Sequence, residues 1–190
     1  MVPITALLLP ILVSAVLVFL ASFVLHMLLE FWHRPDLDSL PDEDGVMAAL
    51  RPFALPPGNY AMPKVHAVSD LKDPAYIEKR KTGPVALLNV LPSGDLGMGR
   101  QLTLWFLFSV FISVFAAYMA GRALGPGAPY LEVFRFTGTT AFAAYAIGQM
   151  QESIWWHRKW STTLRNMIDG LVYALLTAGA FGWLWPEIAM

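Results

Sequence analysis

Two histidines and a glutamate at the end of the first apolar stretch are the residues best suited to chemistry. His26, Glu30 and His33 lie in the segment HMLLEFWH. On an uninterrupted α-helix, this spacing places all three side chains on one face. Imidazole and carboxylate groups are ligands of zinc, iron and manganese. The segment therefore predicts either a set of metal ligands or the hydrated end of a membrane helix.

A second polar group is expected at a similar depth on another helix. Glu152 and His157 lie at the end of residues 133–154, a long and mainly apolar stretch. Metal sites in helix bundles draw Glu and His from facing helices. A metal or haem site is therefore expected between the first and third helices, with ligands from the set His26, Glu30, His33, Glu152 and His157. The alternatives are that these are boundary residues, or that they line a proton- or quinone-related polar pocket.

The composition is that of a membrane protein. Of the 190 residues, 56% are hydrophobic and 14% are charged, which is too apolar for an ordinary soluble domain. The net charge of -1 gives no electrostatic case for a nucleic-acid partner. The lack of cysteine excludes disulfides, thiolate metal sites and a cysteine nucleophile. Common nucleotide-binding, metalloprotease and esterase motifs are also absent, which favours a protein without catalysis of its own.

Four stretches have the length and apolar character needed to cross a bilayer, which takes about 20 residues. They are expected at residues 4–29, 101–121, 133–154 and 168–185. The predicted fold is an all-α integral membrane protein built as a four-transmembrane-helix bundle. Residues 1–33 would form the first helix and residues 101–190 the other three, with a Pro-rich cytoplasmic segment, residues 34–100, between them.

The distribution of lysine and arginine sets the expected orientation. Most of these residues lie in residues 34–100, and Arg158, Lys159 and Arg165 lie between the last two predicted helices. Only Arg122 lies between the second and third. Basic loops remain in the cytoplasm, so both termini are expected on the periplasmic side of a bacterial inner membrane. Asp169, inside the fourth helix, is expected to pair with Arg165 or Lys159.

Residues 34–100 are expected to contain two short helices and little core of their own. Asp42–Leu50 begins with an acidic run, and Asp73–Lys81 begins with an N-cap aspartate followed by proline. Residues 54–63 (ALPPGNYAMP) are predicted to form a turn-rich connector. Residues 85–92 are expected to be a strand or a segment on the bilayer surface.

The second of these short helices ends in a basic cluster. Lys79, Arg80 and Lys81 are consecutive. A polybasic segment gains free energy near anionic lipid headgroups, so the cluster is interpreted as a headgroup contact or, more simply, as a solvated helix end.

Small residues recur every four positions in the last three predicted helices. Such stripes let helix backbones approach closely in a bilayer, where the hydrophobic effect does not drive helix association. The predicted packing residues are Ser109, Ser113, Ala117 and Gly121, then Thr140, Ala144 and Gly148, and finally Ala174, Ala178 and Gly182.

Three functions are compatible with this pattern. The small size, the packing stripes and the coreless cytoplasmic segment favour a scaffold or accessory subunit of a larger bacterial membrane assembly. Its partners would be the lipid bilayer and other membrane subunits or copies of itself. The histidine–glutamate group favours a metal- or haem-binding redox enzyme instead. An oligomeric channel or transporter is the third possibility. No motif identifies a substrate or an oligomeric state.

Overall fold

The computed structural model describes residues 1–94 and 97–187, and these are mostly helical. The chain divides into two compact units. Met1–Asp38 and the chain from Met98 onward form one, called here the helical unit. Ser39–Gly97 forms the other, called here the insert unit. The predicted all-α class is confirmed at this level.

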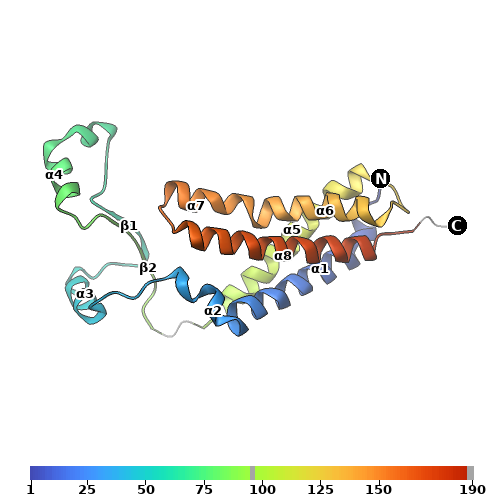
Figure 1. Ribbon diagram of the computed structural model, residues 1–190, viewed down its shortest axis with the longest axis horizontal. Helices are drawn as coiled ribbons and strands as arrows, with labels where there is room; N and C mark the ends of the chain where they lie inside the picture. Colours follow the sequence, from blue (N-terminus) through green and yellow to red (C-terminus); the bar gives the residue numbers. More distant parts are fainter. Residues whose placement is uncertain (95–96, 188–190) are drawn as a thin grey trace. The chain divides into compact units, whose positions relative to one another are not determined.

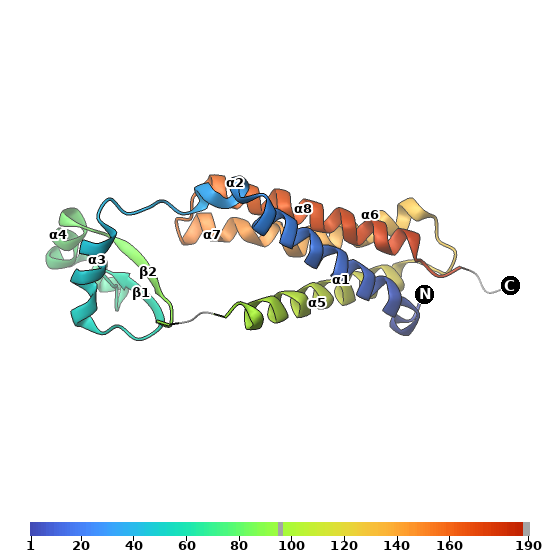
Figure 2. The same ribbon diagram turned by 90° about the horizontal axis from the view of Figure 1, so that it is seen from below.

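Four long helical segments pack side by side in the helical unit (Figures 1 and 2). Their helices are α1 (Leu8–Phe23), α5 (Gly99–Ala123), α6 (Tyr130–Tyr145) continued by α7 (Met150–Trp155), and α8 (Trp160–Trp183). Both α1 and α6 contact α5 and α8, so the four segments form a ring. Successive segments run in opposite directions (Figure 1).

Two of these segments, Ile4–Leu28 and Gly99–Ala123, are long and apolar enough to cross a membrane. The other two do not meet that criterion. The helix α6 has only 16 residues, and α8 carries Arg165 and Asp169. The prediction of four membrane spans is therefore not confirmed as a whole. The helix α8 also begins at Trp160 and not near residue 168, because charged residues with partners on other elements can lie inside a packed helix.

The predicted small-residue stripes lie partly on the packed faces. The stripe of α5 is buried throughout, and Ser113 accepts a hydrogen bond from the Ser14 hydroxyl of α1 at 2.9 Å. In α8, Ala174 and Ala178 are buried. Gly182 is half-buried, and a Cβ there would lie 2.6 Å from the Tyr130 ring.

The packed face of α6 differs from the predicted one. Thr140 is half-buried, and Ala144 and Gly148 are exposed. The buried residues of this helix are Val133, Thr137, Ala141 and Tyr145. This parallel stripe has the same four-residue period but larger side chains, so a rule based on small residues alone selects the wrong one.

The two short helices predicted in the insert unit are confirmed. The helix α3 spans Glu43–Leu50, and Asp42 caps it by accepting the Gly45 N–H at 2.9 Å. The helix α4 spans Pro74–Thr82, with Asp73 as its cap. Its last turn carries Lys79, Arg80 and Lys81, all of which are exposed.

The insert unit also contains a two-stranded antiparallel sheet. Strand β1 (Gly58–Met62) pairs with β2 (Ala86–Val90), which confirms the strand interpretation of residues 85–92. The prediction of a connector over residues 54–63 is wrong for Gly58–Met62. This strand is stabilised by pairing with a partner distant in sequence, which local turn signals do not reveal. None of the described residues of the insert unit is buried.

Candidate metal centre and adjoining cavity

The first helical segment is interrupted where the predicted site residues lie. A π turn spans Val24–Leu28, and Leu29 leaves helical geometry with φ -99° and ψ 56° before α2 (Glu30–His33). A π turn accommodates an extra residue, so later side chains no longer follow the face of α1. The expected common face of the three residues is therefore not formed. Glu30 is exposed, whereas His33 lies against α8.

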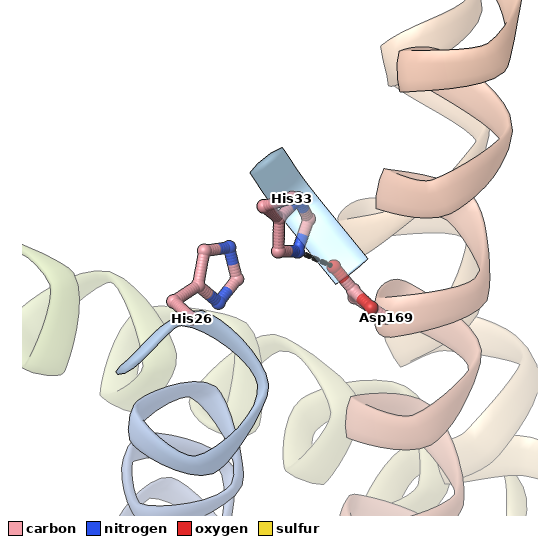
Figure 3. Close-up of side chains that lie close together, drawn as sticks. All are labelled: His26, His33 and Asp169. Atoms are coloured by element: carbon pink, nitrogen blue, oxygen red, sulfur yellow. Dashed lines mark hydrogen bonds and ion pairs between the residues drawn. The ribbon is translucent and has the colours of Figure 1, made fainter. Parts of the chain in front are cut away.

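This break brings together two histidines and an aspartate from α8, His26, His33 and Asp169 (Figure 3). The Nε2 atom of His33 lies 2.8 Å from Oδ2 of Asp169. The two imidazole rings stack, with centroids 4.2 Å apart and 15° between their planes. One potential ligand atom from each residue lies within 4.8 Å of the other two. Asp169 is only 2% exposed, whereas His26 is exposed, so the cluster has one buried and one open side.

Each histidine is held through its Nδ1 atom. His26 Nδ1 lies 3.0 Å from the backbone carbonyl oxygen of Ser22, one turn earlier. His33 Nδ1 lies 2.8 Å from Oδ2 of Asp36. Because a carbonyl oxygen accepts and does not donate, His26 carries its hydrogen on Nδ1, and its Nε2 atom is left as a lone-pair donor when the ring is neutral.

The two aspartates are held in the same way. The indole N–H of Trp32 donates to Oδ1 of Asp169 at 2.8 Å. The guanidinium group of Arg165 pairs with Asp36. Burial alone would raise the pKa of Asp36, but the hydrogen bond from His33 and the positive charges of His33 and Arg165 outweigh it and lower that pKa. Asp36 is therefore an anion at neutral pH and orients the His33 ring.

Two chemical states fit these positions. With a hydrogen on each ring nitrogen, His33 is an imidazolium between the carboxylates of Asp36 and Asp169, and the cluster is an ion network. A divalent metal bound at Nε2 of His33 would replace the hydrogen on that nitrogen, and Asp169 and His26 would supply further ligands. His33 would keep its Nδ1–H bond to Asp36. Such outer carboxylates fix the tautomer and the direction of metal-binding histidines.

A cavity of about 180 Å³ adjoins the cluster. His26 and Asp169 form part of its wall, together with the aromatic side chains of Trp105, Tyr145 and Tyr173. The Trp105 ring centroid lies 6.2 Å from that of Tyr145 and 5.8 Å from that of Tyr173. Both tyrosines are buried, and neither hydroxyl has a hydrogen-bond partner among the described residues.

The other predicted ligands lie outside this cluster. Glu30 is exposed, Glu152 is half-buried in α7, and His157 is exposed in the turn after α7 with φ 56°. The structure therefore brings the first segment against α8 at the site, in place of the third predicted helix.

Asp169 was not among the predicted ligands. Its expected pairing with Arg165 or Lys159 is wrong, because those two side chains pair with Asp36 and Asp38. The available signal was that Asp169 is the one acidic residue of α8. An acidic group within a long apolar helix is a candidate functional residue by default.

Comparison of the chain with protein-family models, with curated proteins and with solved structures finds no match.

Proposed function

We propose that the protein is a multi-pass membrane protein that binds a divalent transition-metal ion at His26, His33 and Asp169. One observation carries the proposal. Each of these residues presents one potential ligand atom to the others, while a second atom of the same side chain is hydrogen-bonded to a group outside the cluster, here called an outer partner. Such outer partners typically raise metal affinity 10–100-fold.

The exposure of the long helices supports a place in the bilayer. In the most apolar parts of Ile4–Leu28 and Gly99–Ala123, only 33% and 28% of the residues are buried. The core helix of a soluble protein would be mostly buried. Large apolar side chains face outward instead, for example Leu20 at 54% exposure and Phe111 at 64%. Lipid tails would cover these side chains at no cost in hydration.

The remaining two segments would cross the bilayer with them. The helix α8 has 24 residues, so at 1.5 Å per residue it is about 36 Å long, enough for a hydrocarbon core of about 30 Å. Under the positive-inside rule, Ser39–Gly97 lies in the cytoplasm and both termini lie in the periplasm of a bacterial inner membrane. The metal site would then lie near the cytoplasmic surface.

The ligand set indicates the class of metal. Two imidazoles and one carboxylate bind zinc in hydrolytic sites and ferrous iron in oxygen-activating sites. Three protein ligands leave at least one coordination position for water or a substrate. A purely structural zinc site would instead be closed by a fourth protein ligand.

Elemental analysis of the gently solubilised protein tests this proposal. We expect about one zinc or iron ion per chain after incubation with either metal, and loss of that metal in His26→Ala and Asp169→Asn. The matched control is His157→Ala, which removes an exposed histidine outside the cluster and should keep the metal. Absence of bound metal, or equal metal in all three variants, would leave only the ion network and reject the metal site.

The insert unit favours a second function, that of an accessory subunit. None of its described residues is buried, yet it exposes apolar side chains such as Leu40, Phe53 and Leu87. A segment of this kind can be ordered by a partner at the time of binding. Purification in a mild detergent, with and without residues 39–97, tests this function. Companion subunits that disappear with the deletion would support it, and a wild-type protein that purifies alone would count against it.

A further inference from the structure

The two-stranded sheet of the insert unit has little support from the rest of that unit. Strand β1 pairs with β2 on one side (Figure 2). Beyond this pairing, no described element packs extensively against either strand. A two-stranded sheet on its own is marginally stable in water, and independent stability takes a third strand or a helix packed on one face. The sheet therefore has room, and a physical reason, to accept a further strand.

The outer edge of β2 is the unprotected one. Among the described residues, no backbone group outside β1 hydrogen-bonds to the backbone of residues 85–91. This run, VALLNVL, contains no charged residue, proline or glycine, whereas sheet edges that avoid pairing usually carry charge or proline. Strand β1, in contrast, begins with Gly58 and is bounded directly by Pro57 and Pro63. A new strand is therefore expected at β2.

The run around β2 is complementary to a second copy of itself. Its midpoint is Leu88, and Pro84 and Pro92 end it at equal distances on the two sides. Two copies aligned antiparallel about Leu88 would therefore pair over the whole run, with the prolines beyond its ends. The facing pairs would be Leu88 with Leu88, Ala86 with Val90, and Leu87 with Asn89. No like charges meet across such a pair, where they would be destabilising.

These features select a second copy as the occupant of the edge. Short apolar strands without charge, proline or glycine are typical of segments that pair with copies of themselves. A two-fold interface requires a surface that is complementary to itself, as this run is. Recognition of a different chain would draw its specificity from charges or pockets along the strand, and β2 carries no charge.

We infer that the protein forms a two-fold dimer in which β2 pairs antiparallel with β2 of a second copy. The two small sheets become one four-stranded sheet in the order β1–β2–β2–β1, and the assembly closes because β1 already occupies the other edge of each β2. The exposed side chains of Leu87 and Leu91 gain neighbours across the new pair. The inference goes beyond the proposed function and relies neither on bound metal nor on a companion subunit.

Single cysteines in the full-length protein test the pairing. The chain has no cysteine, so a disulfide in a single-cysteine variant must join two copies. Directly opposed residues of antiparallel strands have Cα atoms about 4.5 or 5.5 Å apart, and both distances suit a disulfide. Leu88→Cys should therefore cross-link under mild oxidation in detergent.

Two further variants and a control fix the register. Ala86→Cys alone should not cross-link, because the two-fold axis separates its copies by four residues along the strands, roughly 14 Å. Combining Ala86→Cys with Val90→Cys should restore the cross-link, since these positions face each other. The matched control is Ala61→Cys, an exposed position of β1 that lies at least three strand spacings, about 14 Å, from its copy and should not cross-link.

Light scattering of the purified protein in detergent supplies an independent measurement. Wild type should have twice the chain mass. Leu88→Lys places two lysines opposite each other and should lose the dimer, whereas Ala61→Lys, on the outer strand, should keep it. Circular dichroism checks the fold of both variants, and the cysteine variants decide the question if Leu88→Lys does not fold.

Three results would overturn the inference. They are a wild-type protein with the mass of one chain, no more cross-linking in Leu88→Cys than in Ala61→Cys, and equal cross-linking in Ala86→Cys. A dimer without the Leu88 cross-link counts among them, because its interface would lie elsewhere. A co-purifying companion subunit without this cross-link would support the accessory function and reject the dimer alone.

Discussion

Replacement of Gly170 by alanine tests the packing that positions Asp169. Gly170 follows Asp169 in α8 and faces the end of α6. A Cβ added there would lie 2.9 Å from the Cβ of Ala146 and 3.1 Å from the backbone carbon of Tyr145. Because one neighbour is backbone, no side-chain rotation relieves the contact. The two helices would have to separate beside the site.

The size of the effect follows from two opposing terms. Overpacking of this kind typically costs about 1–3 kcal/mol. Alanine is favoured over glycine inside a helix by about 1 kcal/mol. We therefore expect Gly170→Ala to destabilise the protein by up to about 2 kcal/mol.

Gly179, in the same helix, provides a control in which the glycine-to-alanine change in helix propensity is the same. At Gly179 an added Cβ would meet only the Tyr130 hydroxyl, at 3.9 Å, which is an ordinary contact. Gly179→Ala should therefore stabilise the protein by up to about 1 kcal/mol. The difference between the two variants isolates the overpacking cost, about 1–3 kcal/mol.

Denaturant unfolding in detergent micelles, followed by circular dichroism, measures both variants against wild type. Gly170→Ala should also bind metal more weakly, since the displaced helix carries Asp169, whereas Gly179→Ala should not. If the two variants unfold at the same denaturant concentration, the close approach of α8 to α6 at Gly170 is wrong.

Three further outcomes are expected. Trp32→Phe removes the indole N–H that donates to Asp169 and should weaken metal binding about 10–100-fold, as measured by competition with a chelating dye. Unchanged affinity would mean that this hydrogen bond does not orient the Asp169 carboxylate. Chelation should lower the melting temperature of the metal-loaded wild type but not that of Asp169→Asn, because a metal ion at 100 times its Kd adds about 2.7 kcal/mol to the free energy of unfolding. Equal shifts in the two proteins would contradict the metal site. Asp70 accepts hydrogen bonds from the backbone N–H groups of Ala67 and His66, which lowers its pKa from 3.8. The stability that this carboxylate gives to the insert unit should therefore be complete above pH 3.8 and be lost as the pH falls through the lowered pKa. A carboxyl NMR titration midpoint at or above 3.8 would contradict this last expectation.

Local sequence signals predicted the helices well. The caps Asp42 and Asp73 locate the starts of α3 and α4, and the apolar runs locate the long helices, apart from the start of α8 at Trp160. These signals depend on neighbouring residues in the chain, so sequence alone reveals them. The strand Gly58–Met62 was missed because its stability depends on a partner strand at least 24 residues away, counted from Met62 to its pairing partner Ala86.

The candidate site was predictable only in part. His26 and His33 stood out by residue type, but the expected face assumed an unbroken α-helix through Leu29. Asp169 was assigned to Arg165 on the basis of helical spacing. Which of several charged partners a side chain selects depends on tertiary packing, and here Arg165 pairs with Asp36.

The π turn at Val24–Leu28 makes the site sensitive to the number of residues in the chain as well as to their types. Such a turn corresponds to an α-helix with one residue inserted. Deleting any one of its five residues would allow regular α geometry to return. The residues after the turn would then keep nearly the same faces, because the π turn had already absorbed the extra residue. A residue lost from the regular helix before it, Leu8–Phe23, would instead rotate His33 by about 100° relative to the start of α1, the angle between successive α-helical residues. A single codon lost there would separate His33 from Asp169 while leaving both residues in the protein.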